Sequence, residues 1–223
     1  MAEAESKLFK PIVGCEMYVA RRTMDKKEGK PDQSGYHLIV LAKNEKGYHN
    51  LIKLVSHAWT RGYYMRPRTD RSELEKYHEG LIALSACLAG EVQRYLVRGL
   101  YDEAKKTAQR YEACFGKGNY FLELQDHGIP DQKTVNAGLM RLSQELGIEL
   151  VATNDVHYTY AEDWEAHDIL LCCRQGKSCP MRTGCAMRAD SIMSNPRRRC
   201  AHFSLCRAGN REYPRRLQTG VMW

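Results

Sequence analysis

Short apolar runs alternate with longer amphipathic segments from about Lys10 to Lys177, and few folds accommodate such an alternation. The apolar runs have the length of buried strands, and the segments between them carry apolar residues at helical spacing. Strands are predicted over residues 10–19, 36–42, 80–87, 120–125 and 148–153, and helices over residues 44–60, 70–77, 89–99, 101–116, 130–147 and 162–173. This order predicts an α/β fold on a parallel sheet, either doubly wound or closed as a barrel.

Residues that begin and end helices stand where these segments require them. Asp70 precedes one predicted helix as an N-cap, Pro130 opens another, and Gly147 follows that helix at its end. In both candidate architectures the functional groups collect at the carboxyl ends of the strands. The residues that follow the apolar runs are therefore the first candidates for a site.

The alternation stops after Lys177. Residues 178–223 show no sustained period and hold nine Arg, no Lys and two acidic residues, so the net charge of +7 lies entirely in this stretch. As a binding module, this stretch could grip phosphates through its arginines and hold zinc through Cys179, Cys185, Cys200, Cys206 and His202. Both close cysteine pairs are separated by five residues, however, whereas structural zinc sites use about two to four. We expect one domain over residues 1–177 and an unstructured tail over 178–223, whose arginines are not a nucleic-acid site.

The sequence also indicates a compartment. No stretch reaches the roughly 18 to 20 apolar residues of a membrane helix, and the opening "MAEAESKLFK" lacks the apolar centre of a signal peptide. Nine cysteines in such a chain are more typical of reduced thiols or metal ligands than of disulfides. We therefore expect a cytoplasmic protein with no membrane partner.

Several side chains of the kind that bind zinc-like ions lie on or just beyond the predicted strands: Glu16, His37, Cys87, Asp126, His127, Asp155 and His157. Asp155 and His157 form the strongest pair, because residues two apart in an extended segment point to the same side. His37 fits least well, since it lies near the start of its strand. Taken singly, a cysteine at the end of a strand is more typical of the core, and a lone histidine is more typical of a satisfied polar group.

A second chemistry is open at Cys87, which could act as a thiolate nucleophile with His127 or His157 as its base. The residues around Cys87 match no nucleophile signature, and the chain has no glycine-rich phosphate loop of either common type. The residues alone thus indicate an α/β domain with a candidate metal site.

Five stretches, taken together, carry a resemblance to a known family: "KPIVGCEMYVA", "GYHLIVLAKNEKGYHNLIKLVSHAW", "EGLIALSACLAGEVQRYL", "NYFLELQDHGIPDQKTVN" and "LVATNDVHYTYAEDWEAHDILLC". From Lys10 to Lys177 the chain resembles the polymerase-and-histidinol-phosphatase (PHP) domain of bacterial DNA polymerase III alpha subunits. The resemblance implies a distorted seven-stranded (βα) barrel whose site holds up to three metal ions, zinc or manganese, and whose activity in some members is a 3′ to 5′ exonuclease.

Carried over residue by residue, the resemblance marks Glu16, His37, Cys87, Asp155 and His157 as metal ligands and marks no catalytic residue of its own. Asp126 and His127 match the family sequence but not its ligand set. The family's opening His-x-His strand and its Thr-Asp-His-Gly motif are not found upstream of "KPIVGCE", so about four of roughly nine ligands are missing. The resemblance therefore implies an incomplete barrel and an incomplete metal site.

The resemblance also offers an origin for residues 178–223. After the equivalent of Lys177 the family continues with a sequence like "RYEGGQYYVKS". One allowed back-translation of Cys185 to Pro196, read one base earlier, encodes those eleven residues. A frameshift soon after Lys177 would also explain the excess of Arg, Cys and Met, and we expect one.

These observations predict a piece of a replicative DNA polymerase alpha subunit that covers most of a PHP domain and lacks the polymerase active site. Its partners would be DNA and replisome subunits, reached through the parent protein. Two alternatives stay open: a free-standing phosphoesterase similar to histidinol phosphatase, and a non-catalytic module that stabilises the polymerase. Metal content and cleavage of single-stranded DNA would distinguish them.

Overall fold

A computed structural model describes residues 11–158, 160 and 163–175. Six strands form one sheet: β1 (Gly14–Val19), β2 (Tyr36–Ala42), β3 (Arg68–Thr69), β4 (Leu81–Leu84), β5 (Tyr120–Leu124) and β6 (Leu150–Ala152). The helices are η1 (Lys30–Asp32), α2 (Glu45–Thr60), α3 (Arg71–Tyr77), α4 (Glu91–Val97), α5 (Tyr101–Phe115), α6 (Pro130–Leu146) and α7 (Trp164–Gln175). The expected α/β class is confirmed, and β3 and η1 are the elements that the sequence pattern did not predict.

The sheet is mixed rather than parallel, which corrects the expectation. Its strands run in the order β3-β1-β2-β4-β5-β6; β1 and β4 each pair antiparallel with β2, whereas β4, β5 and β6 are parallel to one another. Parallel neighbours need a crossover, usually a helix, and the connection from β1 to β2 contains only the single turn η1. Among the described residues the paired series ends at β3 and β6, so closure into a barrel is not shown.

Helix ends follow the signals in the sequence. The Asp70 side chain accepts a hydrogen bond from the Glu73 N–H, which opens α3 as expected, and its other oxygen accepts from the Met24 N–H at 2.9 Å. Pro130 occupies the first turn of α6, and Gly147 ends that helix in the left-handed region with φ of 71°. A glycine suits this position because a Cβ is strained there.

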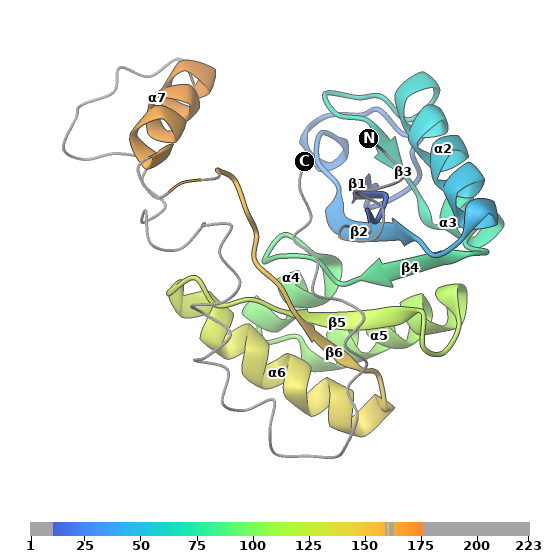
Figure 1. Cartoon of the computed structure of the whole chain (residues 1–223), viewed down its shortest axis with the longest axis vertical. Helices are drawn as coiled ribbons and strands as arrows, with labels where there is room; N and C mark the ends of the chain where they lie inside the picture. The colour runs from blue at the N-terminus through green and yellow to red at the C-terminus, as the bar shows by residue number, and fades with distance from the viewer. Residues whose placement is uncertain (1–10, 159, 161–162, 176–223) are drawn as a thin grey trace, which may run out of the picture.

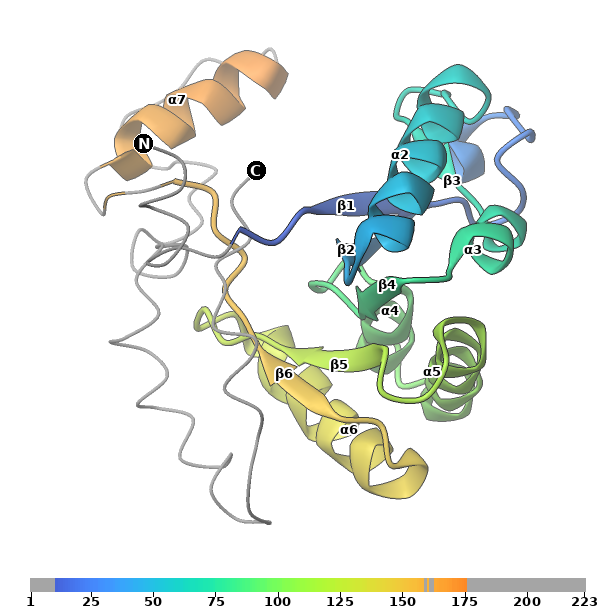
Figure 2. The same ribbon diagram turned by 45° about the vertical axis from the view of Figure 1, so that its right-hand side comes forward.

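The two faces of the sheet carry different amounts of apolar packing. The larger core lies under the helices and includes Val40, Leu54, Ala83, Leu122 and Leu139, each almost fully buried. The opposite face holds a smaller cluster of Ile39, Leu41, Leu84 and Ala86. Figures 1 and 2 show α2, α4, α5 and α6 along one side of the strand series, with α7 beyond the end of β6. No helix in the described part of the chain is long and apolar enough to cross a membrane.

Candidate metal centre

Three of the expected ligands meet on the less covered face of the sheet. Glu16 lies on β1 directly opposite Ile39 of β2, so the two side chains share a face, and His37 lies two residues before Ile39 on the same face. Ile39 pairs in turn with Leu84 at the end of β4, and the chain continues from there into the loop with Cys87. The antiparallel register therefore brings the start of β2 to the carboxyl end of β4.

The distances among these side chains are short. Nδ1 of His37 lies 2.5 Å from Oε1 of Glu16 and 3.4 Å from Sγ of Cys87. The three residues each offer one ligand atom, and those atoms lie within 4.8 Å of one another. The ring of Tyr18 meets that of His37 edge to face, with 5.0 Å between centroids. His37, which strand position made the weakest candidate, is thus central to the cluster.

The loop from Ser85 to Gly90 sets the position of Cys87. Ala86 has φ of 65°, a left-handed conformation that costs a non-glycine residue about 1 kcal/mol or more. A Cβ on Gly90 would lie 2.1 Å from the Ser85 carbonyl oxygen, so only glycine fits there. The N–H of His37 donates to the carbonyl of Ala89 at 3.1 Å, which joins this loop to β2.

Asp155 and His157 follow β6 and lie outside the close group of three. Asp155 lies close enough to Cys87 for its charge to raise the pKa of the Cys87 thiol. The charge of Glu16 in turn raises the pKa of Asp155. His157 turns toward its own segment: its Nδ1 lies 3.0 Å from the Asp155 carbonyl oxygen and 3.8 Å from Oδ1 of Asp155. The two side chains are neighbours, as their spacing indicates, and the His157 side chain is 38% exposed.

Asp126 and His127 have separate surroundings. Asp126 is exposed, and its Oδ1 accepts from the Gly128 N–H at 3.1 Å. His127 is buried, with Nδ1 2.9 Å from the Gln132 side-chain nitrogen and Nε2 3.3 Å from the Asp155 backbone nitrogen. His127 therefore contacts the Asp155 segment through the main chain.

Burial raises the pKa of several acidic groups at the centre. The pKa of the Cys87 thiol is raised to about 12, first by burial and then by the Asp155 carboxylate. Burial likewise raises the pKa of Asp155, with a contribution from Glu16. Buried anionic groups that lie close together repel one another. A cation bound between them offsets this repulsion and stabilises their ionised forms.

The burial of Cys87 also affects whether its sulfur can act as a nucleophile. With its pKa near 12 the sulfur is a thiol at neutral pH, and nucleophilic cysteines need a lowered pKa. The ring 3.4 Å from this sulfur is that of His37, whereas the nucleophile hypothesis named His127 or His157 as the base. The arrangement opposes the nucleophile hypothesis.

The donor set fits a zinc-like ion. A carboxylate oxygen, an imidazole nitrogen and a cysteine sulfur are the ligands that zinc combines in proteins. Sequence reasoning missed Ser85, at the start of the loop of Cys87, and Gln93 and Glu123, which bond to Ser85. The available signal was a glutamate in the apolar run "YFLELQ". Residues 178–223, with the alternative zinc ligands Cys179, Cys185, Cys200, Cys206 and His202, lie outside the described residues.

Comparisons with known proteins identify the family of this chain. The family model described as "PHP domain" matches residues 1–127. The chain is 49% identical over 177 residues to the DNA polymerase III subunit alpha of Treponema pallidum, an alignment that covers 78% of this chain and 15% of that protein. The subunits of Borreliella burgdorferi and Thermus aquaticus are 45% and 43% identical over 175 and 164 residues; these alignments cover 78% and 73% of this chain and 15% and 13% of those proteins. This chain thus spans about 15% of the length of such relatives, and it belongs to the PHP-domain family.

Proposed function

We propose that this chain is the PHP portion of a DNA polymerase III alpha subunit and that it binds a divalent cation, zinc or manganese. The single observation that carries the metal centre is the meeting of Glu16, His37 and Cys87 within 4.8 Å. The relatives named above carry the alpha-subunit name, which favours this branch over a free-standing histidinol-phosphatase-like enzyme. We also propose that residues 1–177 belong to a barrel of the PHP type, and that the protein acts in the cytoplasm.

Glu16, His37 and Cys87 would hold the cation, with Asp155 and His157 as ligands from the next segment. A bound cation of this kind supplies Lewis acidity to a phosphodiester and activates a water. To bind it, Cys87 must lose its proton, as must Nδ1 of His37 where it carries one. Since the pKa of Cys87 is raised to about 12 without metal, binding releases a proton and strengthens as pH rises.

The reaction that we propose for this centre is hydrolysis of single-stranded DNA from its 3′ end. In the parent protein, DNA synthesis would belong to another part of the chain, and DNA and replisome subunits would be the partners. The arginines of residues 178–223 have no place in this proposal, and a frameshift after Lys177 remains our explanation of their abundance.

A second candidate is a metal-bound module that stabilises the polymerase without catalysis. The cluster of Glu16, His37 and Cys87 favours it, because among the described residues these three ligand atoms gather around one point and suit one ion, whereas paired ions clamp both oxygens in phosphodiester hydrolysis. In such a module the cation would stabilise the fold by mass action, by about 2.7 kcal/mol when free metal is at 100 times its dissociation constant.

One experiment separates these functions. The full chain is freed of metal with a chelator, titrated with zinc and with manganese by calorimetry, and then incubated with single-stranded DNA labelled at its 5′ end. We expect stoichiometric binding with proton release; the catalytic function further predicts a ladder of products shortened from the 3′ end. Binding without cleavage, with a raised melting temperature, would establish the stabilising module instead. Absence of stoichiometric binding by either metal would overturn the metal centre itself.

A further inference from the structure

A buried carboxyl group lies between the loop that carries Cys87 and the segment that carries Asp155. These two stretches are the two arms of the candidate metal centre, and the carboxyl group is part of neither. Glu123 is on β5, the strand between β4 and β6, and the residue is only 5% exposed. A carboxyl group in the interior needs partners, because burying it without hydrogen bonds is costly. Its partners therefore indicate what it holds in place.

On one side Glu123 reaches the segment that carries Asp155. Its Oε1 accepts a short hydrogen bond from the Thr153 hydroxyl and a second bond, of 3.2 Å, from Nε2 of Gln125. Nε2 of Gln125 also lies 3.3 Å from the Thr153 hydroxyl oxygen, and the Gln125 carbonyl accepts from Asn136 of α6 at 2.9 Å. Thr153 comes directly after β6 and two residues before Asp155, so these bonds fix the start of that segment.

On the other side Glu123 reaches the loop that carries Cys87. The Glu123 N–H donates to the Ser85 hydroxyl oxygen at 2.8 Å, and the Gln93 side-chain nitrogen donates to that hydroxyl at 2.7 Å and to the Ala86 carbonyl at 2.9 Å. Burial raises the pKa of Glu123, and the hydrogen bonds from Thr153 and Gln125, together with the nearby Ala86 N–H, offset part of that rise. Ala86 holds its left-handed conformation because its surroundings impose it.

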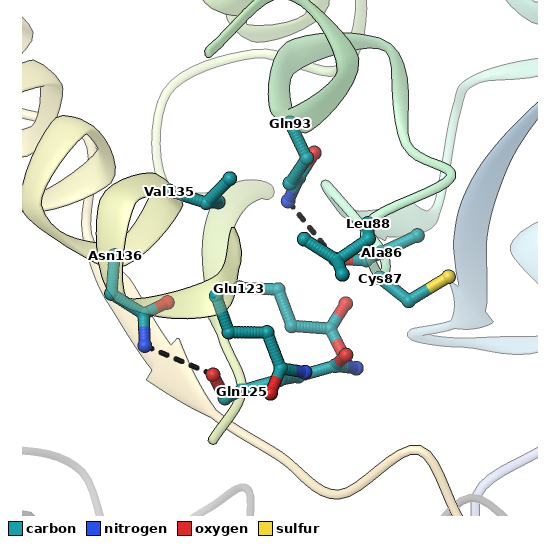
Figure 3. Close-up of a pocket in the computed structure, with 9 residues that line it drawn as sticks. Ala86, Cys87, Leu88, Gln93, Glu123, Gln125, Val135 and Asn136 are labelled. Atoms are coloured by element: carbon teal, nitrogen blue, oxygen red, sulfur yellow. Dashed lines mark hydrogen bonds between the residues drawn. The ribbon is translucent and has the colours of Figure 1, made fainter. Parts of the chain in front are cut away.

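Figure 3 shows these groups around one small cavity. Ala86 and Cys87 come from the loop after β4, Gln93 from α4, Glu123 from β5, and Gln125 directly follows β5. Oε2 of Glu123 and Oε1 of Gln93 are both buried without a protein partner among the described residues. Their two residues line the same cavity, which at about 10 Å³ has room for about one water that could donate to both.

We propose that Glu123 is a positioning residue that joins the Cys87 loop to the Asp155 segment: its N–H donates to Ser85 at the start of the loop, and its carboxyl group accepts from Thr153 at the start of the segment. The inference rests on the proposed metal centre for its function and on the hydrogen bonds above for its structure. Removing the Glu123 side chain frees the Asp155 segment and takes the carboxyl group away from the Ala86 N–H, whereas the bond from the Glu123 N–H to Ser85 stays.

The test uses cobalt(II) as the probe, because a cobalt–thiolate bond gives a charge-transfer absorption that reports on Cys87 directly. Glu123→Ala is expected to weaken cobalt binding by about 10- to 100-fold, the range for residues that orient metal ligands. Glu123→Gln keeps an oxygen that accepts from Thr153, and its affinity is expected to stay within about threefold of the parent chain. Glu149→Ala removes an exposed carboxylate just before β6 and serves as the matched control, with an affinity expected within about twofold of the parent chain.

A second variant keeps the proposal falsifiable if Glu123→Ala does not fold. Thr153→Val removes the hydroxyl that donates to Glu123 and is expected to weaken cobalt binding about tenfold. Wild-type affinity in both Glu123→Ala and Thr153→Val, or an equal loss in Glu149→Ala, would overturn the positioning role.

A readout without metal separates this inference from the proposed function. In the metal-free chain, alkylation of Cys87 is followed by mass spectrometry, with the exposed Cys173 as internal reference. Glu123→Ala is expected to raise the Cys87 rate about tenfold or more relative to Cys173, since a loosened loop opens more often. If the parent chain binds no cobalt, the proposed function fails and this rate still decides whether Glu123 holds the loop; an unchanged rate would refute it.

Discussion

The antiparallel and parallel halves of the sheet place their polar residues in different ways. In the antiparallel half, strand pairing itself sets Glu16 beside His37, because cross-strand neighbours share a face. In the parallel half, Asp155 and His157 lie beyond the end of β6 in a stretch without regular structure, and side-chain hydrogen bonds position that stretch. The positions of Glu16 and His37 therefore depend on the strand pairing of the whole sheet, whereas the positions of Asp155 and His157 depend on a few side-chain contacts.

The largest expected effect is at Cys87, where the two halves meet. Cys87→Ser should weaken zinc binding by more than about 100-fold, beyond the loss that follows removal of a residue that only orients ligands. The reason is that a hydroxyl does not ionise at neutral pH and is a poor ligand for zinc. Zinc titration with a competing chelator measures the loss.

Cys114→Ser is the matched control for this change, since Cys114 is a half-buried cysteine on α5. Equal affinities of the Cys87→Ser variant and the parent chain would remove Cys87 from the centre.

A second prediction addresses the parallel half through pH. Burial raises the pKa of Glu123 from its usual 4.5 to about 7. The unfolded chain therefore releases this proton first as pH rises, so the contribution of Glu123 to stability falls between pH 4.5 and about 7. At about 1.4 kcal/mol for each pH unit, this loss approaches 3 kcal/mol. Glu123→Gln cannot titrate and should gain on the parent chain over that range.

Denaturant unfolding of both metal-free proteins, at a series of pH values from 4 to about 8, measures this difference in the free energy of unfolding. A difference that does not change with pH would show that Glu123 ionises normally in the folded chain.

A third prediction compares the ligands after β6 with each other. Asp155→Asn should weaken zinc binding about tenfold, because it removes a charge that lies near Cys87 and Glu16. His157→Ala should weaken zinc binding by a smaller factor than Asp155→Asn, about three- to tenfold, since the His157 side chain is 38% exposed and bonds its own segment. Calorimetric titration of both variants checks the order. A larger loss for His157→Ala would mean that metal binding rearranges this segment.

The smallest effect concerns the connection between β1 and β2. Asp32 pairs with Arg22 and accepts from the Glu28 N–H at 2.8 Å, and the Arg22 guanidinium holds the pKa of Asp32 at about 2. A pKa below the usual 3.8 means that this pair stabilises the fold above pH 3.8 and that the gain is lost as pH falls toward 2.

The free energy of unfolding of Asp32→Asn should thus be lower than that of the parent chain at neutral pH, and the two should converge in acid. Parallel denaturation curves at pH 7 and at about 2.5 test this. A gap that stays constant over that range would mean that the pair adds no stability.

The sequence predicted the elements better than their arrangement. Apolar runs and caps such as Asp70, Pro130 and Gly147 act locally, so the positions of strands and helices could be read from them. Strand direction depends on which distant segments pair, and local periodicity does not record it. For that reason the mixed sheet was missed.

The ligand set shows the same limit. His37 looked poorly placed because, in a parallel sheet, the start of a strand lies opposite the edge where functional groups collect. Since β2 pairs antiparallel with its neighbours, the start of β2 lies beside the carboxyl end of β4 instead. The resemblance to the family marked Glu16, His37 and Cys87 as metal ligands, and the structure brings these three side chains together, which their spacing alone did not predict. Glu123 and Gln93 were missed because the value of a buried polar residue depends on partners from other strands and helices.

The pairing of β1 with β2 also bears on the choice of metal. A slip of one residue would turn Glu16 away and bring Cys15 or Met17 to its place, because each step along a strand changes the face. The centre would then combine two sulfur atoms with His37, a donor set that favours softer ions such as copper(I). A Cβ on Gly14 would lie 2.4 Å from the Leu41 side chain in the present register, which shows how closely the two strands fit there. In the proposed metal centre, the register of this one strand pair therefore sets which donor atoms face the ion.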